Sequence, residues 1–271
     1  MAKRLHIPIY HMEAGNRSFD LNVPEEINRR IIDHISDFNL VYTENSRRHL
    51  ISEGLPHRRI YLTGTPMYEV LKYYSDKIDK STILDTLSLK SKEFFVVSMH
   101  REENVDNIQI LKNIVSILNK LAKDYDLPVI VSTHPRTRKR LNAAENFDID
   151  NRISFLKPFG FLDYIQLQKN ALCVISDSGT ISEESAILDF PAITLRNSME
   201  RPEALDAGSI ILTGFNINIV ISSIKIVIDQ HQINGNKKSV PNEYLIPDTS
   251  HRVLNLIIGT TKLSNLWDGI R

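Results

Sequence analysis

Nine short apolar runs recur along this chain, and longer amphipathic segments separate most of them. Three of the runs lie within residues 4–65 and six lie within residues 93–214. Strand-like runs that alternate with helix-like segments are typical of parallel sheets, in which a helix links each strand to the next. The sequence therefore predicts an α/β fold. The predicted strands are RLHIPIYHM, FNLVYTE, RIYLTGT, EFFVVSMH, LPVIVSTH, RISFLKPF, ALCVISDS, PAITLR and SIILTG, and the longest predicted helix is NIQILKNIVSILNKLAKDY.

The stretch TGTPMYEV, residues 63–70, places glycine and proline between the two series of runs and predicts a boundary between two lobes. We assign residues 1–66 to a first lobe, residues 67–240 to a second lobe, and residues 241–271 to C-terminal helices that return to the first lobe. The first lobe then holds three predicted strands, whereas a doubly wound sheet usually has about five or six. This shortage predicts an incomplete first lobe.

Charge and composition exclude several classes of partner. Lys and Arg total 33 and Asp and Glu total 33, so no net charge favours nucleic acid or an acidic membrane surface. The apolar run near the N-terminus is too short for a signal peptide, and no run reaches membrane-spanning length. A single cysteine, Cys173, excludes an internal disulfide and suits a reducing compartment. These features predict a cytoplasmic globular protein that binds neither nucleic acid nor membrane.

The stretch HMEAGNRSFDLNVPEEINRR, residues 11–30, crowds charge beside a predicted strand. Pro24 suits the first turn of a helix, where Glu25 is favoured by the helix dipole. Glu25 and Arg29 lie one turn apart, and as a surface pair they contribute about 0.3 to 0.5 kcal/mol. Glu13 instead follows a strand at the carboxyl end, where open α/β sheets bind ligands, so Glu13 and Glu25 are also candidates for one shared cleft. On the other side of the helix an apolar stripe is expected to pack, formed by Ile27, Ile31 and Ile35.

A second motif, SDSGTISEES, leaves a predicted strand and enters a helix at residues 176–185. The backbone N–H groups of Ser178, Gly179 and Thr180 at a helix N-terminus predict a phosphate site. Thr180 and Glu183 have the spacing of a capping box, which gives Glu183 a structural role. Glu184 is then left as a candidate ligand-binding residue.

Histidine and arginine follow two further strands. SMHREEN holds His100 and Arg101, and STHPR holds His134 and Arg136, where a ring and a guanidinium can contact a diphosphate. A single histidine is more often a structural residue, but two at equivalent strand ends favour a ligand site. RNSMERPEAL adds Arg201 in a loop rich in charge. No HxxxH or cysteine-rich cluster is present, so we predict no metal site.

Taken in order, six stretches of this chain resemble the UDP-N-acetylglucosamine 2-epimerase family over nearly its whole length: HMEAGNRSFDLNVPEEINRRIIDHISD, GTPMYEVL, MHREEN, THPR, SDSGTISEES and RNSMERPEAL. EAGNRSFDLNVPEEINRR and YTENSRRHLISEGLP are most similar to the UDP-N-acetyl-L-fucosamine synthase branch, which epimerises C2 of UDP-2-acetamido-2,6-dideoxy-L-talose for surface polysaccharides. The resemblance implies two Rossmann-like lobes of the GT-B type with a UDP-sugar between them, an isomerase that needs no cofactor, and a homodimer.

The family is understood to eliminate UDP, form a glycal and add UDP back. The resemblance therefore implies that Glu13 and Glu25 are catalytic carboxylates, with Arg29 as a ligand or charge partner, and that His100 meets the departing diphosphate. It also implies that the Ser178 loop holds phosphate oxygens and that Glu184 accepts from the ribose hydroxyls. The other predicted substrate-binding residues are Gly179, Thr180, Arg101, His134, Arg136 and Arg201.

Two features of the family pattern are absent from the sequence: a Gly-rich basic loop after a first strand, and an HGD-type motif. We therefore expect about three βα units, on the order of 90 residues, to be missing before residue 1, and we expect epimerase activity to need them. Three alternatives stay open. The substrate pair could be UDP-N-acetylglucosamine and UDP-N-acetylmannosamine, the chain could be a GT-B glycosyltransferase, which has no need of Glu13 and Glu25, or it could be a non-catalytic UDP-binding remnant.

Overall fold

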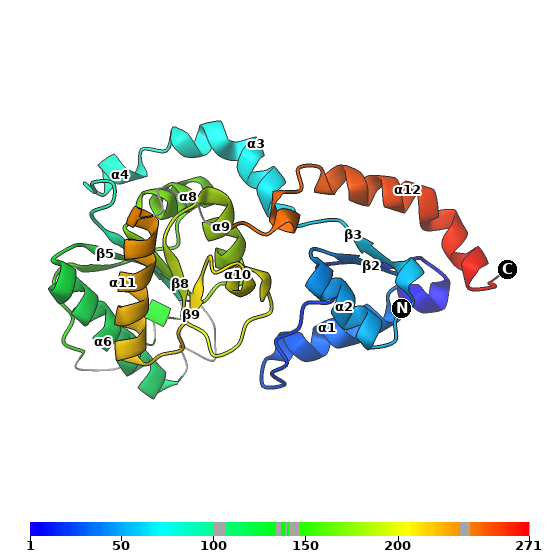
Figure 1. The fold of residues 1–271 in the computed structure, drawn as a ribbon, viewed down its shortest axis with the longest axis horizontal. Coiled ribbons are helices and arrows are strands. Elements are labelled where there is room, and N and C mark those ends of the chain that lie inside the picture. Colours follow the sequence, from blue (N-terminus) through cyan, green and yellow to red (C-terminus); the bar gives the residue numbers. More distant parts are fainter. Residues whose placement is uncertain (100–106, 134–136, 139, 141–146, 234–238, 271) are drawn as a thin grey trace. The chain divides into compact units, whose positions relative to one another are not determined.

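The structure is a computed structural model, and it describes residues 1–99, 107–133, 137–138, 140, 147–233 and 239–270. Contacts divide the chain into two compact units. Unit 1 comprises Met1–Tyr73, Ser198–Glu203 and Val240–Arg271, and unit 2 comprises Tyr74–Asn197 and Ala204–Ser239. Each unit contains one parallel sheet (Figure 1). The predicted α/β fold with parallel sheets is therefore confirmed.

Unit 1 is built on a three-stranded parallel sheet in the order β1-β2-β3. Helix α1 connects β1 to β2, and helix α2 with the short 3-10 helix η2 connects β2 to β3. The side chain of Thr43 accepts a hydrogen bond from the backbone N–H of Ser46, which fixes the start of α2. The elements of unit 1 are η1 (Ala2–Leu5), β1 (Tyr10–Met12), α1 (Pro24–Ile35), β2 (Phe38–Val41), α2 (Glu44–Ser52), η2 (His57–Arg59), β3 (Ile60–Leu62), η3 (Asn242–Leu245) and α12 (Thr249–Trp267).

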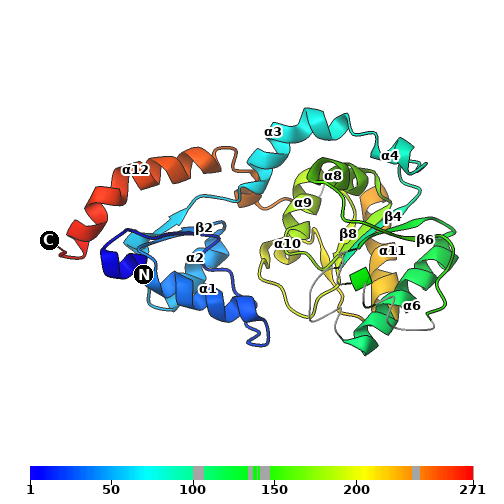
Figure 2. The ribbon, with the colours of Figure 1, turned by 180° about the vertical axis from the view of Figure 1, so that it is seen from behind.

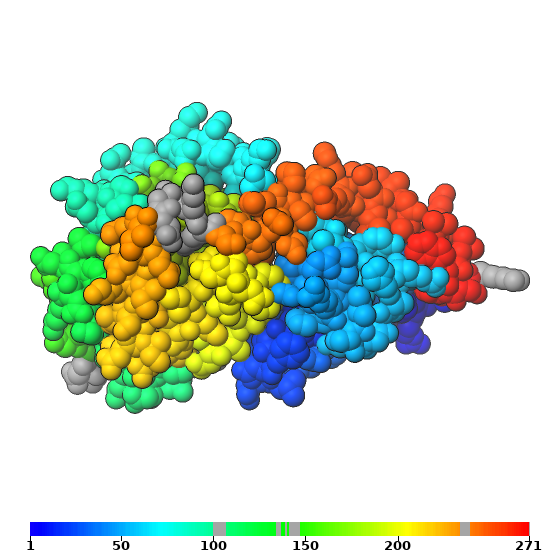
Figure 3. All heavy atoms as spheres, in the orientation of Figure 1, coloured from blue at the N-terminus to red at the C-terminus, as the bar shows by residue number. Residues whose placement is uncertain are grey.

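Successive side chains of β1 point to opposite faces of this sheet, which determines the helix that covers each face. The Tyr10 hydroxyl lies 2.7 Å from the hydroxyl of Thr260 on α12, and the Tyr10 ring stacks on Phe38 at 4.6 Å. His11, the next residue, donates through Nδ1 to Asp33 of α1 at 2.7 Å. Helices α12 and α1 therefore cover opposite faces of the sheet, which the views from the two sides allow the reader to follow (Figures 1 and 2). In the space-filling view α12, in red, lies against the blue residues of unit 1 (Figure 3).

Helix α1 buries its polar side and exposes its apolar stripe. Glu26 and Asp33 are fully buried, whereas the isoleucines of the stripe are 47 to 55% exposed. The expectation that this stripe packs is therefore wrong within the described part of the chain. The reason is electrostatic, because the buried guanidinium of Arg17 pairs with Asp33 and holds that side of the helix inward. The stripe consists of Ile27, Ile31 and Ile35.

Unit 2 contains a six-stranded parallel sheet in the order β6-β5-β4-β7-β8-β9. Its main core lies between this sheet and helices α6 and α11, and the views from the two sides show α8 and α9 on the other face (Figures 1 and 2). Burial of both faces explains why the central strands read as continuous apolar runs. The elements are α3 (Met67–Asp79, begun in unit 1), α4 (Ile83–Thr86), β4 (Phe95–Met99), α6 (Ile108–Tyr125), β5 (Val129–Thr133), β6 (Ile153–Leu156), α8 (Phe161–Asn170), β7 (Cys173–Ser176), α9 (Ile181–Leu188), β8 (Ala192–Thr194), α10 (Glu203–Asp206), β9 (Ile211–Leu212) and α11 (Ile217–Ile233).

The predicted boundaries differ in detail from the observed ones. Each of the nine predicted strands contains one observed strand, but residues 2–5 form a 3-10 helix that ends at His6, whose φ of 56° is left-handed. The division between units falls inside helix α3, between Tyr73 and Tyr74. Ser198–Glu203 groups with unit 1, although it lies between strands of unit 2 in the sequence. The lobe limits at residues 66 and 240 stay predictions.

Candidate functional site

The residues after β1 form a tight turn that presents Glu13. Glu13 has a left-handed φ of 62°, and Gly15 follows with a φ of 78°. A Cβ at Gly15 would lie 2.3 Å from the backbone oxygen of Ser46, so no other residue fits there. The Glu13 side chain is 35% exposed, and its Oε1 accepts a hydrogen bond from Nδ2 of Asn16 at 3.1 Å. A partly exposed carboxylate thus lies at the carboxyl end of β1, as the sequence predicts for a ligand site.

Two arginines join Glu13 within unit 1. Arg201 donates to Oε1 of Glu13 at 2.8 Å, and Arg29 of α1 lies 3.5 Å from the same oxygen. Arg29 also pairs with the buried carboxylate of Glu200 at 3.6 Å. Three of the predicted site residues, Glu13, Arg29 and Arg201, are therefore brought together. Their arrangement places one carboxylate beside two guanidinium groups.

Segment 198–203 is held to unit 1 at three points. Arg201 contacts Glu13, Glu200 contacts Arg29, and the hydroxyl of Thr43 donates to the carboxylate of Glu203. Glu200 and Glu203 are buried. Three of the charged residues of RNSMERPEAL therefore make contacts within unit 1: Glu200, Arg201 and Glu203.

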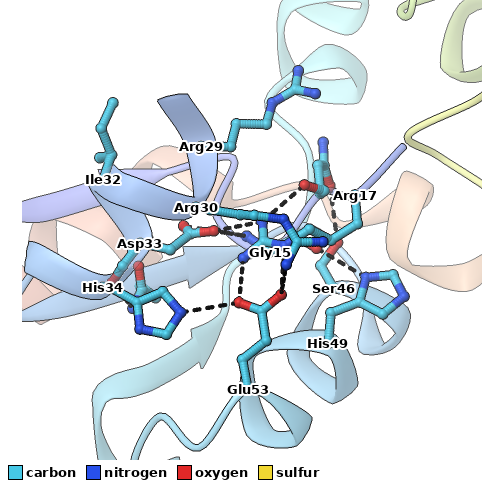
Figure 4. A network of polar contacts seen from close by, with 12 residues as sticks. Gly15, Arg17, Arg29, Arg30, Ile32, Asp33, His34, Ser46, His49 and Glu53 are labelled. Carbon is cyan, nitrogen blue, oxygen red and sulfur yellow. Dashed lines mark hydrogen bonds and ion pairs between the residues drawn. The ribbon is translucent and has the colours of Figure 1, made fainter. Parts of the chain in front are cut away.

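A buried ionic network contacts the backbone of this turn (Figure 4). Arg17 is completely buried and donates to both oxygens of Glu53, at 2.8 and 2.7 Å, and to Asp33 at 2.7 Å. Arg30 and His34 of α1 also contact Glu53, at 3.3 and 3.1 Å. Hydrogen bonding from Arg17 lowers the pKa of Glu53 from the ordinary value of 4.5 to about 2. Glu53 therefore carries its negative charge throughout the neutral pH range.

The structure separates the two neighbouring glutamates at the start of α1. Glu25 is exposed and makes no hydrogen bond or ion pair with any described residue, so the surface pair with Arg29 is not formed. Glu26 is buried and accepts from the backbone N–H of Ser18 at 2.8 Å and from Arg30 at 2.9 Å. No site role was predicted for Glu26 from the sequence. Adjacent residues of an α-helix point in different directions, so one glutamate can be buried while its neighbour is exposed.

In unit 2, the predicted phosphate loop lies between β7 and α9. The Ser178 hydroxyl lies 2.9 Å from the Thr180 hydroxyl, and the backbone N–H of Thr180 points to Ser178 Oγ at 3.3 Å. Thr180 is the N-cap of α9, but its side chain makes no capping hydrogen bond. The predicted capping box is therefore wrong on its Thr180 side, because Ser178 takes up that hydroxyl. Ser178, Gly179 and Thr180 still precede the helix N-terminus, which is where the sequence places an anion.

Glu184 lies one turn into α9 and is 7% exposed. One of its oxygens accepts from Nε2 of Gln168 on α8 at 2.8 Å. Burial, and then the negative charge of Glu184, raise the pKa of the Tyr164 phenol above its usual value. Tyr164 and Gln168 were not predicted as neighbours of Glu184, because they lie on a different helix whose sequence pattern indicates only packing. Four further predicted residues, His100, Arg101, His134 and Arg136, lie outside the described residues.

Two absences apply to the part of the chain that the structure describes. Within it, no group of three or more His, Cys, Asp and Glu side chains could hold a metal ion. None of its helices combines the length and apolar character needed to cross a membrane.

Two units, each built on a parallel α/β sheet, are the architecture of GT-B-like proteins. Comparison with known proteins identifies the group within this class. The sequence model described as "UDP-N-acetylglucosamine 2-epimerase" matches residues 1–258, and the chain therefore belongs to the UDP-N-acetylglucosamine 2-epimerase family.

Relatives support this assignment in sequence and in structure. The UDP-N-acetylglucosamine 2-epimerase of Methanocaldococcus jannaschii is 37% identical over 237 residues, which are 85% of this chain and 64% of that protein. The structure of UDP-N-acetylglucosamine 2-epimerase from Rickettsia bellii is 45% identical with a TM-score of 0.91, covering 97% of this chain and 70% of the other. The M. jannaschii enzyme in complex with UDP-GlcNAc and UDP is 35% identical with a TM-score of 0.85, covering 95% and 71%. This chain thus spans about two thirds of the length of these relatives.

Proposed function

We propose that this chain is a UDP-N-acetylhexosamine 2-epimerase that works by elimination and re-addition of UDP. The observation that carries the proposal is the cluster of Glu13, Arg29 and Arg201. A general base at C2 needs a partly exposed carboxylate that is held in one place. In the forward direction a base takes the C2 proton while the C1–O bond breaks and UDP departs with the bonding electrons. UDP then adds back at C1 while a proton is delivered to the opposite face of C2.

Each named residue has a role in this scheme. Glu13 takes or gives the C2 proton on one face, and Glu25 serves the other face. Arg29 and Arg201 hold the Glu13 carboxylate in place. His100 meets the departing diphosphate, and Arg101, His134 and Arg136 bind beside it. The Ser178 loop holds phosphate oxygens, and Glu184 accepts from the ribose hydroxyls, so that unit 2 supplies the nucleotide-binding residues.

We further propose that the substrate is UDP-2-acetamido-2,6-dideoxy-L-talose, which yields UDP-N-acetyl-L-fucosamine for surface polysaccharide synthesis. EAGNRSFDLNVPEEINRR and YTENSRRHLISEGLP favour this substrate. The names of the relatives favour UDP-N-acetylglucosamine as the alternative. Family membership favours either reaction over glycosyl transfer.

The test is C2 exchange in deuterated water. Each UDP-sugar is incubated with the chain and with a chimera that places the N-terminal portion of the R. bellii protein before residue 1. We expect deuterium at C2 and the new epimer from the chimera, and loss of both in Glu13→Gln and Glu25→Gln chimeras with little change in UDP affinity. Asp20→Asn is the control, because the side chain of Asp20 forms hydrogen bonds only with Asn22 among the described residues. Absence of deuterium with both sugars, from chain and chimera alike, would refute the proposed function, and equal rates would refute the need for further units.

A further inference from the structure

Asn16 is the residue through which the buried network reaches Glu13. It is 3% exposed, and three of its polar atoms form hydrogen bonds. Its backbone oxygen accepts from Arg17 at 2.9 Å, and its side-chain Oδ1 accepts from the hydroxyl of Ser46 at 2.9 Å. The side-chain Nδ2 donates to Oε1 of Glu13. The orientation of the carboxamide is therefore fixed before it meets the carboxylate.

The contacts of Glu13 are divided unequally between its two oxygens. Oε1 faces Asn16, Arg201 and Arg29, at 3.1, 2.8 and 3.5 Å. Among the described residues none donates to Oε2. One oxygen is thus anchored by two hydrogen-bond donors and one ion pair, while the other has both lone pairs available.

We propose that Asn16 is a positioning residue that anchors Oε1 of Glu13, so that Oε2 is the oxygen that exchanges the C2 proton, and that Arg17 keeps Asn16 in place. This inference rests on the proposed function of Glu13. A base that reacts at carbon must approach its proton along one direction, and a misplacement of about 1 Å can cost on the order of 10²-fold in rate. Two hydrogen bonds and an ion pair on one oxygen leave Glu13 little rotational freedom.

The residues on either side of Asn16 form hydrogen bonds with side chains in the interior of unit 1. Asp33 is fully buried and accepts from the backbone N–H of Gly15 at 3.2 Å and from Arg17 at 2.7 Å. His49 of α2 donates to the backbone oxygen of Gly15 at 3.0 Å. Both peptide groups of the turn are therefore tied to side chains of α1 and α2. Figure 4 shows Arg17 between Asp33 and Glu53, with Ser46 and His49 beside Gly15.

The decisive variant is Asn16→Asp, which keeps the shape and an acceptor for Ser46 but replaces the donor toward Glu13 with an oxygen. In the form that shows C2 exchange, we expect kcat to fall on the order of 10²-fold with KM within about 2-fold. Arg17→Lys should lower kcat in the same direction, because lysine cannot reproduce the planar fork.

Thr249→Val is the matched control. Thr249 is buried in the same unit and donates to the backbone oxygens of Thr63 and Thr65, each at 3.1 Å. This variant should lower stability and leave kcat of the folded protein unchanged. If Asn16→Asp retains the kcat of the native protein, or lowers kcat no more than Thr249→Val does, the positioning role is wrong.

A second measurement, on the 271-residue chain, is independent of turnover. With 15N-labelled asparagine, the side-chain amide resonance of Asn16 should shift in Glu13→Gln and broaden in Arg17→Lys, and Asp20→Asn should leave it unchanged. An Asn16 resonance that does not respond to Glu13→Gln would overturn the proposal, whatever the outcome of the exchange assay. A response without C2 exchange in any form would uphold the anchoring of Glu13 and refute only the proposed function.

Discussion

Replacing Arg17 with methionine is expected to destabilise unit 1 by about 3 to 5 kcal/mol. Methionine fills a similar volume but donates no hydrogen bond, so Asp33 loses its charged partner while fully buried. Glu53 loses two hydrogen bonds but keeps Arg30 and His34 and is 18% exposed. Most of the cost therefore arises at Asp33. Because a whole domain is stable by only about 5 to 15 kcal/mol, such a loss is large.

The same substitution should change how stability depends on acid. Arg17 lowers the pKa of Glu53 from 4.5 to about 2. The contribution of ionised Glu53 to the free energy of unfolding is therefore fully present above pH 4.5 and is lost as pH falls toward 2. One pKa unit corresponds to about 1.36 kcal/mol, so the lowering of the Glu53 pKa corresponds to roughly 3 kcal/mol. Screening by solvent reduces this free energy to about 1 to 2 kcal/mol. Between pH 4.5 and 2 the stability difference between native protein and Arg17→Met should therefore shrink by this amount.

Trp267 makes the measurement specific to unit 1. It is the single tryptophan of the chain, and its ring lies 6.1 Å from Phe38 of the unit 1 sheet. Urea unfolding followed by Trp267 fluorescence, at several pH values, gives the free energy of unfolding of each variant. Arg252→Met is the control, because Arg252 and its partner Asp248 are 41% and 46% exposed, so its loss should cost about 1 kcal/mol or less. If Arg17→Met costs no more than Arg252→Met, the buried network does not stabilise the turn.

Three further predictions use the same reasoning. Gly15→Ala should cost at least about 2 kcal/mol in urea unfolding through its left-handed φ and its clash with Ser46, whereas Gly54→Ala, with a φ of 88° and no atom within 4 Å, should cost about 1 kcal/mol; equal costs would contradict this. Arg59→Ala should red-shift Trp267 emission and cost about 2 to 4 kcal/mol, because Arg59 joins the sheet to Ser264 and Asp268; an unchanged spectrum would refute it. Glu184→Ala should weaken UDP more than uracil by about 1 to 3 kcal/mol in calorimetry, and equal weakening would remove Glu184 from the ribose site.

The strands could be predicted from sequence because their signal is local. Strands β4 and β7, which lie within the runs EFFVVSMH and ALCVISDS, are buried on both faces, so the hydrophobicity of each strand is visible without knowing its neighbours. The position of Glu13 at the carboxyl end of β1 could also be predicted, because the run that forms β1 ends directly before it. The carboxyl ends of parallel strands meet at one edge of the sheet. The contact between Glu13 and Arg201, 188 positions away, has no local signal and depends on the fold.

Helix α1 shows why local pattern fails elsewhere. Its isoleucine stripe indicates a buried face, yet Glu26 and Asp33 are the buried residues. The deciding factor is Arg17, whose complete burial requires carboxylates around it, and nothing in the letters EAGNRS reveals that burial. Because the side of α1 that carries Glu26 and Asp33 faces inward, Glu25 is exposed. The sequence alone therefore could not show that Glu25 and Arg29 form no ion pair.

The chain path of unit 1 also affects when it can fold. Helix α12 covers the Tyr10 and Phe38 side of the sheet, but the ribosome adds Val240 roughly 10 to 30 s after Tyr73 at about 5 to 20 residues per second. Every residue of unit 2 is made before that moment. We therefore expect nascent unit 1 to wait with one face of its sheet uncovered, the stage at which a chaperone would bind. The unit whose synthesis begins first is the one that completes its folding last.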